Sequence, residues 1–307
     1  MKYTLLGSLG HISSIVAPAL VKAGNTVTVI SSNEKRAEQI RQIGAIPAIG
    51  DMQDAEFLTK QFTGADAVYV MLSSIGGPTG SVFESTNAQG AIFAKAVQQA
   101  GVTNVVDLSS IGADNPDAGV VYAYHLIEDQ LRALPNVNVA FVRPVGFYSN
   151  LYSNMDSIKN EHAIYSNIPA DVKRRWVAPE DIEAVVEKLL LHVPQGKTIH
   201  YVYSDEFTTT ELIEELKQAL ELPDLHFVPI TDEQTRQAMV ARGVPENLAQ
   251  LFVQMSVFER DSEKVYGDLK NEPTTVGTFK LADFVREFKQ VYEKPDMTNQ
   301  SNTLIDK

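Results

Sequence analysis

Short apolar runs alternate with amphipathic segments through the first half of the chain. The runs show little of the every-second-residue alternation of a half-exposed strand, so they are typical of strands buried on both faces. They lie at residues 2–6, 24–30, 45–54, 66–72, 104–110 and 138–144. Helical spacing predicts helices between them, at 12–22, 32–44, 55–65, 84–100 and about 120–133. This order predicts a doubly wound α/β fold, in which a parallel sheet is covered by helices and ligands bind at the carboxyl ends of the strands.

The second half of the chain is less regular. Thr208 and Glu211 have the spacing of a capping box, which predicts the start of a helix. The predicted elements are a helix at 178–191, a strand at 197–204, a helix from 208 to about 220, and two helices that flank a break at 243–245. We therefore predict a smaller, mostly helical C-terminal substrate domain. The predicted division is residues 1–152 for the first domain, 153–293 for the second and 294–307 for a flexible tail.

Composition and charge narrow the classes of function. The 307 residues are 44% hydrophobic, which is enough for a substantial core. The net charge of -13 argues against nonspecific binding to nucleic acid or to an anionic membrane, because both require a positive field. No run in the sequence approaches the roughly 18 consecutive apolar residues of a spanning helix. We therefore expect a small-molecule substrate, with no nucleic acid and no membrane as partner.

The chain contains no cysteine, which excludes disulfides, thiolate nucleophiles and cysteine-based metal sites. Its six histidines are scattered without the spacing of metal ligands, so no metal site is expected. The first apolar run stops after two leucines, and no basic leader or cleavage site follows. Cytoplasmic localisation is the resulting expectation.

The stretch "YTLLGSLGHISS" carries two glycines, Gly7 and Gly10, between the first strand and the first helix. In that position glycines let the backbone approach a pyrophosphate, whose charge the helix N-terminus favours. The alternative is a tight turn that binds no ligand. A third glycine would stand at position 13, where this chain has Ser13; His11, within the loop, either contacts phosphate or lies on the surface.

The end of the second strand bears on the choice of nucleotide. An acidic residue there would bind the ribose 2′-hydroxyl of NAD, but the chain has Ser31, Ser32 and Asn33, followed by Lys35 and Arg36. Hydroxyls, an amide and two cations suit a 2′-phosphate, which favours NADP(H) over NAD(H). Serine and asparagine are also common helix caps. Asp51, after the third strand, either accepts from an adenine amino group or caps the next helix.

A candidate acid follows the fifth strand. Ser109, Ser110 and Gly112 end that strand, and Tyr124 lies on the following helix. In a Tyr-x-x-x-Lys pair the lysine lowers the pKa of a tyrosine that protonates a carbonyl substrate. Tyr124 has Glu128 at the lysine position. Tyr124 is therefore either a hydrogen-bond donor to substrate or an aromatic residue of the core.

These features together resemble the NmrA-like branch of the atypical short-chain dehydrogenase/reductase family, over residues 2–290. The resemblance rests on "GSLGHIS" for the family's glycine loop, "GDMQD" after the third strand and "LSSIGAD" after the fifth. It extends to "RPVGFYSNL" after the sixth strand, to "WVAPEDIEAVV", where the family's chain returns to the main domain, and to "EPTTVGTFKLADFVREF", which resembles the closing helix. The family has an NAD(P)-binding Rossmann domain.

The resemblance implies which residues meet cofactor and substrate. The pyrophosphate would be bound by Gly7, Leu9, Gly10, His11 and Ile12, and the adenosine ribose phosphate by Ser31, Asn33 and Arg36. The adenine would be bound by Asp51 and Met52, and the nicotinamide by Leu72, Ser73 and Ser110. The substrate cleft would be lined by Tyr124, Pro144, Val145, Gly146, Phe147 and Asn150. The chain departs from the family at Ser13, where a small residue still permits close packing, and at Glu128, since many members carry a lysine on that helix.

Two functions follow from the resemblance. The first is an NADPH-dependent oxidoreductase, similar to the family's quinone reductases, that transfers hydride to a quinone or a similar conjugated acceptor, with Tyr124 as the candidate catalytic residue. Such an acceptor can take its proton from water. The second is a non-enzymatic NAD(P) redox sensor, similar to the family's regulators, that acts through a protein partner.

Overall fold

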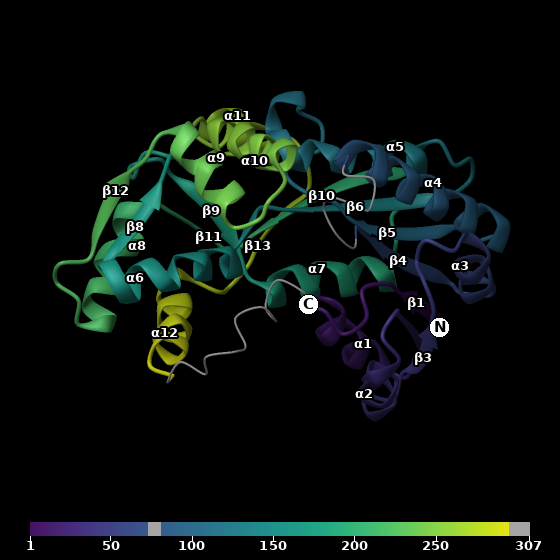
Figure 1. Cartoon of the computed structure of the whole chain (residues 1–307). Coiled ribbons are helices and arrows are strands. Elements are labelled where there is room, and N and C mark those ends of the chain that lie inside the picture. The colour runs from purple at the N-terminus through teal and green to yellow at the C-terminus, as the bar shows by residue number, and fades with distance from the viewer. Residues whose placement is uncertain (73–80, 295–307) are drawn as a thin grey trace.

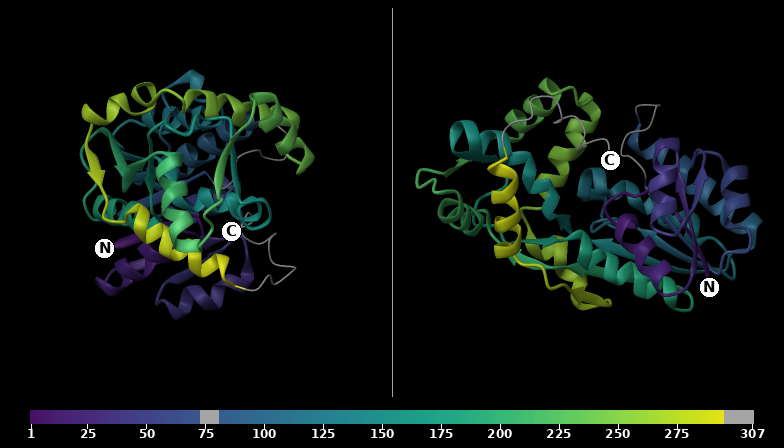
Figure 2. Two further views of the ribbon diagram at one scale, coloured as in Figure 1. Left: turned by 90° about the vertical axis from the view of Figure 1, so that its left-hand side faces the viewer. Right: turned by 90° about the horizontal axis from the view of Figure 1, so that it is seen from below.

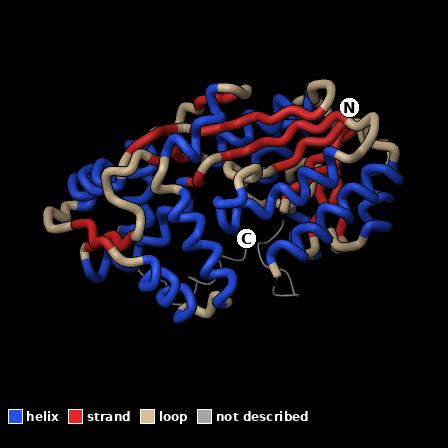
Figure 3. The backbone as a smooth tube through the Cα atoms, turned by 90° about the horizontal axis from the view of Figure 1, so that it is seen from above, coloured by secondary structure: helices blue, strands red, loops and turns tan. Residues whose placement is uncertain are grey.

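The computed structural model describes residues 1–72 and 81–294 (Figure 1). Its centre is an eight-stranded sheet in the order β13-β10-β6-β5-β4-β1-β2-β3, with every neighbouring pair parallel. The sheet confirms the doubly wound fold, and its strands run side by side with helices on both faces in Figure 3. Its strands are β1 (Lys2–Leu5), β2 (Thr26–Ser31), β3 (Ile46–Ile49), β4 (Ala67–Met71), β5 (Asn104–Leu108), β6 (Asn138–Pro144), β10 (Lys197–Tyr203) and β13 (Thr274–Val276).

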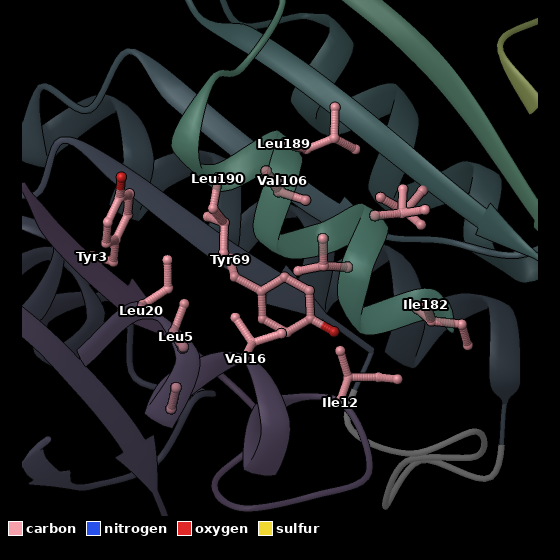
Figure 4. Close-up of a cluster of buried hydrophobic side chains, with 14 of the residues drawn as sticks. Tyr3, Leu5, Ile12, Val16, Leu20, Tyr69, Val106, Ile182, Leu189 and Leu190 are labelled. Atoms are coloured by element: carbon pink, nitrogen blue, oxygen red, sulfur yellow. The ribbon is translucent and has the colours of Figure 1, made fainter. Parts of the chain in front are cut away.

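Helices cover the two faces because their apolar stripes match the buried strands. Figure 4 shows one face, where Val16 and Leu20 of α1 and Leu189 and Leu190 of α7 surround Tyr69 of the sheet. The first face is covered by α1 (Ser13–Lys22), α2 (Ala37–Gln42) and α7 (Pro179–Leu191), and the other by α3 (Ala55–Phe62), α4 (Val82–Ala100) and α5 (His125–Arg132). The first face thus receives a helix from the second half of the chain.

Two predicted helices begin as 3₁₀ turns. The helix predicted at 32–44 consists of η1 (Glu34–Arg36) and α2, and the one at about 120–133 of η2 (Pro116–Tyr124) and α5. Gly119 breaks regular helix geometry within η2, with φ +59°. A Cβ there would lie 2.2 Å from the carbonyl oxygen of Leu251, so glycine lets helix α10 pack directly on η2.

The remaining elements form a smaller unit at one end of the sheet. It contains two small sheets, β11-β9-β7 and β12-β8, as well as helices. Helices α8 and α12 pack side by side (Figure 2). Both contribute to a core that is rich in aromatic side chains. Its elements are β7 (Gly146–Phe147), η3 (Tyr148–Asn154), α6 (Met155–Glu161), β8 (Ala163–Ser166), β9 (Arg174–Val177), β11 (Asp205–Phe207), α8 (Thr209–Leu220), β12 (His226–Pro229), α9 (Asp232–Ala241), α10 (Glu246–Phe258), α11 (Ser262–Tyr266), η4 (Gly267–Lys270) and α12 (Leu281–Tyr292).

Several predictions for this half are confirmed. Thr208 and Glu211 form the capping box of α8, and the break at 243–245 separates α9 from α10.

Across residues 1–72 and 81–294, no helix has both the length and the apolar character needed to cross a bilayer.

Asp181, at the start of α7, fixes the path of the chain between β13 and α12. Its carboxylate accepts hydrogen bonds from the backbone N–H groups of Thr278 (3.0 Å) and Phe279 (3.2 Å) and from the Ser204 hydroxyl (2.5 Å). A Cβ at Gly277 would lie 2.2 Å from a carboxylate oxygen of Asp181, so only glycine permits this approach. One carboxylate therefore joins α7, the end of β10 and the turn before the closing helix.

Candidate active site

The segments predicted to bind the cofactor follow neighbouring strands of the large sheet. Parallel strands bring their carboxyl ends to one edge, so the ends of β1, β2, β3, β4 and β5 form a continuous rim. Strand order reverses between β1 and β4, where doubly wound folds bind their ligands. The rim carries the predicted cofactor residues, with Ser73 outside the described residues.

The glycine loop after β1 is a closed turn. The backbone N–H of Gly10 donates to the carbonyl oxygen of Gly7 at 3.0 Å, and Gly7 has φ +92°. A Cβ at Gly10 would lie 3.0 Å from that carbonyl, and one at Gly7 would lie 3.3 Å from the Ser13 hydroxyl oxygen. Residues 7–11 remain half-buried or exposed. The loop is thus tight inside and accessible outside, as a pyrophosphate cradle requires.

Ser13 performs the packing role expected of a small residue at this position. Its side chain is buried, and its hydroxyl donates to the carbonyl oxygen of Leu6 at 2.8 Å. This bond draws the start of α1 against β1. Within the same segment Ile12 is buried in the core and Leu9 packs against it, while His11 is exposed, so Ile12 faces the loop only through its backbone.

The ribose side of the rim is held by polar contacts. Ser31 is buried, and the Ser8 hydroxyl donates to its side chain at 3.0 Å, which ties the glycine loop to the end of β2. Asn33 caps η1 by accepting from the backbone N–H of Lys35 at 3.0 Å. The half-buried Arg36 donates to Gln39 at 3.0 Å. The capping alternative for Asn33 is therefore realised, and the Arg36 guanidinium keeps further donors for a phosphate.

At the adenine side, the alternative role of Asp51 as a helix cap is wrong. Asp51 is exposed and accepts a hydrogen bond from the backbone N–H of Gln53 at 2.9 Å, whereas Asp54 caps α3. Asp54, three residues later, is the cap because it directly precedes the first helical turn. Met52 packs against the core under α3 and α4.

The predicted nicotinamide and substrate residues lie at the ends of β4, β5 and β6. Leu72 is buried and Ser110 half-buried. Pro144, the last residue of β6, and Val145, which follows it, are buried, and Val145 directs its side chain into the core. Gly146 and Phe147 are half-buried and form β7, which pairs with β9, while Asn150 is exposed. Roles for these residues stay predictions.

Tyr124 is the last residue of η2, directly before α5, and is half-buried. Burial is the main cause that raises the pKa of Tyr124 to about 12. At neutral pH the phenol is protonated, and it can donate a hydrogen bond. Glu128, one helical turn later, faces the same side as Tyr124 but points its carboxylate into a buried ion pair.

The ion pair joins Glu128 of α5 to Arg143 at the end of β6. Arg143 donates from Nε at 2.9 Å and from Nη2 at 2.8 Å, and Ser109 and Arg132 donate to the same carboxylate at 2.6 Å and 2.9 Å. Burial opposes the charge of Glu128, but these donors, with Arg143 foremost, hold its pKa below the ordinary value. All the accepting positions needed for a stable buried carboxylate are therefore filled from within the protein.

Arg143 also connects the substrate loop to the sheet. Its Nη1 donates to Asp114 at 2.7 Å and to the Tyr201 hydroxyl at 3.1 Å. Arg143 directly precedes Pro144, and Ser109 directly precedes Ser110, so the network braces both walls of the expected nicotinamide end. Sequence reasoning did not assign Ser109 or Arg143 a role. The sequence feature that could have indicated a role for Arg143 is its position as the one charged residue in the mostly apolar run at 138–144.

Comparison with known proteins agrees with this geometry. A curated relative, the NAD(P)H azoreductase of Xenophilus azovorans, is 27% identical over 247 residues, which are 80% of this chain and 82% of the azoreductase. The structure of an NADPH-dependent quinone oxidoreductase from Escherichia coli in complex with NADPH has a TM-score of 0.74 at 19% identity, over 93% of this chain and 99% of that one. The Citrobacter triphenylmethane reductase complexed with NADP(H) has a TM-score of 0.71 at 20% identity, over 93% and 99%.

The two solved structures show a shared fold. The sequence profile described as the NmrA-like family matches residues 2–291, nearly the whole chain. The glycine loop, the segment after β6 and the closing helix, which carried the predicted resemblance, all lie within that match. The chain belongs to the NmrA-like family.

Proposed function

We propose that the protein is an NADPH-dependent oxidoreductase that reduces a quinone or a similarly conjugated small molecule. The observation that carries the proposal is the rim of the sheet, where the glycine loop, the end of β2 and the end of β5 meet at the topological switch point. The residues fit a dinucleotide because the glycine loop is closed by its own backbone, its residues 7–11 are half-buried or exposed, and α1 begins directly behind it. The names of the azoreductase, quinone oxidoreductase and triphenylmethane reductase relatives support the same class.

The side chains at the rim suggest how the reaction divides between cofactor and protein. Reduced nicotinamide, when bound, supplies a hydride. Tyr124 supplies a hydrogen bond at the other end of the acceptor, and the braced walls after β5 and β6 hold the acceptor ring in place. Because no lysine lowers the pKa of Tyr124, the site suits acceptors that already stabilise the added electrons by conjugation.

The test is oxidation of NADPH, followed by its loss of absorbance, with a quinone, an azo dye, a triphenylmethane cation dye and an unconjugated ketone. We expect turnover with conjugated acceptors and not with the ketone. Absence of turnover with every conjugated acceptor contradicts the proposal. Calorimetric binding of NADPH in the same preparation, tighter than that of NADP without turnover, would instead indicate the redox sensor.

The preference for NADPH has its own test at Arg36. We expect Arg36→Ala to raise KM for NADPH about 10-fold and to leave KM for NADH unchanged, because a charge-assisted bond to phosphate contributes roughly 1.5–3 kcal/mol. Arg41→Ala is the matched control, since Arg41 lies on α2, the helix that Arg36 directly precedes, is exposed and pairs with Glu38 at 3.3 Å. Equal effects of Arg36→Ala on both cofactors would place the 2′-phosphate elsewhere.

A further inference from the structure

A pair of glutamine side chains holds the turn that follows β3. Gln89 of α4 is 1% exposed, and its Nε2 donates to the backbone carbonyl oxygen of Met52 at 3.0 Å. Its Oε1 accepts a hydrogen bond from Nε2 of Gln53. Both ends of the buried amide are therefore bonded to the turn, as a buried polar group requires.

These bonds fix the direction in which each amide faces. A backbone carbonyl only accepts, so Gln89 must present its NH2 group to Met52 and its oxygen to Gln53. Gln53 must meet that oxygen with its own NH2 group, and its Oε1 is left directed away from Gln89. Among the described residues no group donates to this oxygen, and Gln53 is exposed. The turn thus presents a fixed carbonyl acceptor at the surface.

The turn lies beside the ribose side of the rim. The backbone N–H of Gly50 donates to the carbonyl oxygen of Ser31 at 3.0 Å, which joins the end of β3 to the end of β2. Asp51 closes the turn, because its carboxylate accepts from the backbone N–H of Gln53 at 2.9 Å and its carbonyl oxygen accepts from that of Asp54 at 3.1 Å. A base attached to a ribose at the end of β2 therefore comes to lie against this turn.

We infer that Gln53 recognises the adenine of the cofactor, by accepting a hydrogen bond from its 6-amino group through Oε1. The inference rests on the proposed function, which supplies the cofactor, and deepens it by assigning the choice of base. Gln53 is the specificity residue, and Gln89 is a positioning residue, because it acts only by holding the Gln53 amide. The 6-amino group carries two N–H donors, so Asp51 and Gln53 can each accept one of them.

A fixed acceptor selects adenine against a base that has an oxygen at the same position. Hypoxanthine carries a carbonyl oxygen at C6, where adenine carries its amino group. Opposite Oε1 of Gln53 this oxygen would set two acceptors against each other with no proton between them. The Gln53 amide cannot turn its NH2 group toward the base without giving up its bond to Gln89. A site that is built to form a hydrogen bond rejects the analogue that leaves its polar group unpaired.

Calorimetric binding of NADPH and of its hypoxanthine analogue, the 6-deamino dinucleotide, tests this role without turnover. We expect the wild type to bind NADPH about 10-fold more tightly than the analogue. Gln53→Leu should raise the Kd of NADPH about 3- to 10-fold, the usual effect of losing a neutral hydrogen bond, and should not raise the Kd of the analogue. The ratio of the two Kd values should therefore fall by the same factor.

Gln89→Leu should have the opposite signature, because it frees the Gln53 amide to rotate. NADPH should bind within about twofold of the wild type, whereas the analogue should bind about 3-fold more tightly, since Gln53 can then turn its NH2 group toward the C6 oxygen. A purely structural role for Gln89 would instead weaken the binding of both dinucleotides. Gln98→Leu is the matched control, because Gln98 is exposed near the other end of the same helix. It should leave both Kd values unchanged.

The outcomes separate the inference from the proposed function. If the wild type binds NADPH but reduces no conjugated acceptor, the proposed function fails, and the binding of the two dinucleotides still decides the role of Gln53. If Gln53→Leu changes both Kd values by the same factor, or changes neither, the inference is overturned. It is overturned equally if Asp51→Ala alone abolishes the preference for NADPH, or if Gln89→Leu weakens the binding of both dinucleotides alike. Should Gln89→Leu fold poorly, Gln53→Leu still decides, because it changes an exposed side chain.

Discussion

Glu128→Lys would complete the Tyr-x-x-x-Lys spacing that Tyr124 lacks, and we expect it to disrupt the site rather than to activate the tyrosine. The Glu128 side chain is 2% exposed and accepts four hydrogen bonds, two of them from Arg143. Lysine accepts none of these bonds. Its ammonium group would also stand against the guanidinium of Arg143, whose other ion pair is with the half-exposed Asp114.

The expected cost follows from the burial of the pair. Removing one partner of a buried ion pair costs about 3–5 kcal/mol, because the other charge is left uncompensated. The free energy of unfolding of a typical domain is about 5–15 kcal/mol, so Glu128→Lys should lose between about a fifth and the whole of it. Urea denaturation followed by circular dichroism gives this free energy, with Glu128→Gln as the control that keeps one acceptor oxygen.

A double-mutant cycle separates the ion pair from general damage to the core. Glu128→Leu and Arg143→Met should each be strongly destabilising, and the double variant should lose less than their sum, since neither charge then remains alone. The reasoning is refuted if Glu128→Lys unfolds within about 1 kcal/mol of the wild type, a margin near the usual effect of a surface substitution. Faster reduction of a ketone by Glu128→Lys would refute it equally, because the lysine would then reach Tyr124.

Three further predictions concern stability. The pKa of Asp107 in the folded protein lies above its unfolded value of 3.8, so the wild type should lose stability relative to Asp107→Asn as pH rises above about 4. The loss is at most ~1.4 kcal/mol per pH unit. Urea denaturation midpoints across the pH range measure it, and a difference between the two proteins that does not change with pH contradicts the prediction. Gly119→Ala should destabilise the protein by roughly 1–3 kcal/mol from backbone strain alone, and the clash with Leu251 should add to this loss. Gly24→Ala is the control, because Gly24 also has a positive φ but an added Cβ there meets no other atom. The difference between the two variants in thermal unfolding measures the cost of the clash. Asp181→Ala should cost about 2–4 kcal/mol by removing three accepted bonds, and hydrogen exchange at Thr278 should rise; unchanged protection there would show that the turn holds without it.

The strands of the large sheet other than β13 could be predicted from sequence because each contains an apolar run, which is a local signal. Strand β13 was not predicted, since it has only three residues, two of them exposed. The rim of loops follows because parallel strands joined by right-handed connections bring their carboxyl ends to one edge. The order of the eight strands was not predicted. The residues at which the helices after β2 and β5 begin were harder to predict from the sequence. At Gly119 the backbone conformation is set by the carbonyl oxygen of Leu251, which is distant in sequence, and no local pattern reports that contact. The small sheets of the C-terminal unit were missed for a related reason, since strands of two to four residues carry too little periodicity.

The acid site shows where the sequence alone reaches its limit. The spacing of Tyr124 and Glu128 revealed that a lysine is absent, but spacing within one helix could not show that Glu128 is paired with Arg143 on a strand. Once that pair is known, Glu128 cannot serve as a proton donor, because its charge is fixed by the donors around it. Asp107 then differs from Glu128 in the decisive respect: it is equally buried, but it has no donor to stabilise its charge among the described residues. Two buried acids on one side of the sheet therefore have pKa values shifted in opposite directions, that of Glu128 downward by its donors and that of Asp107 upward by burial.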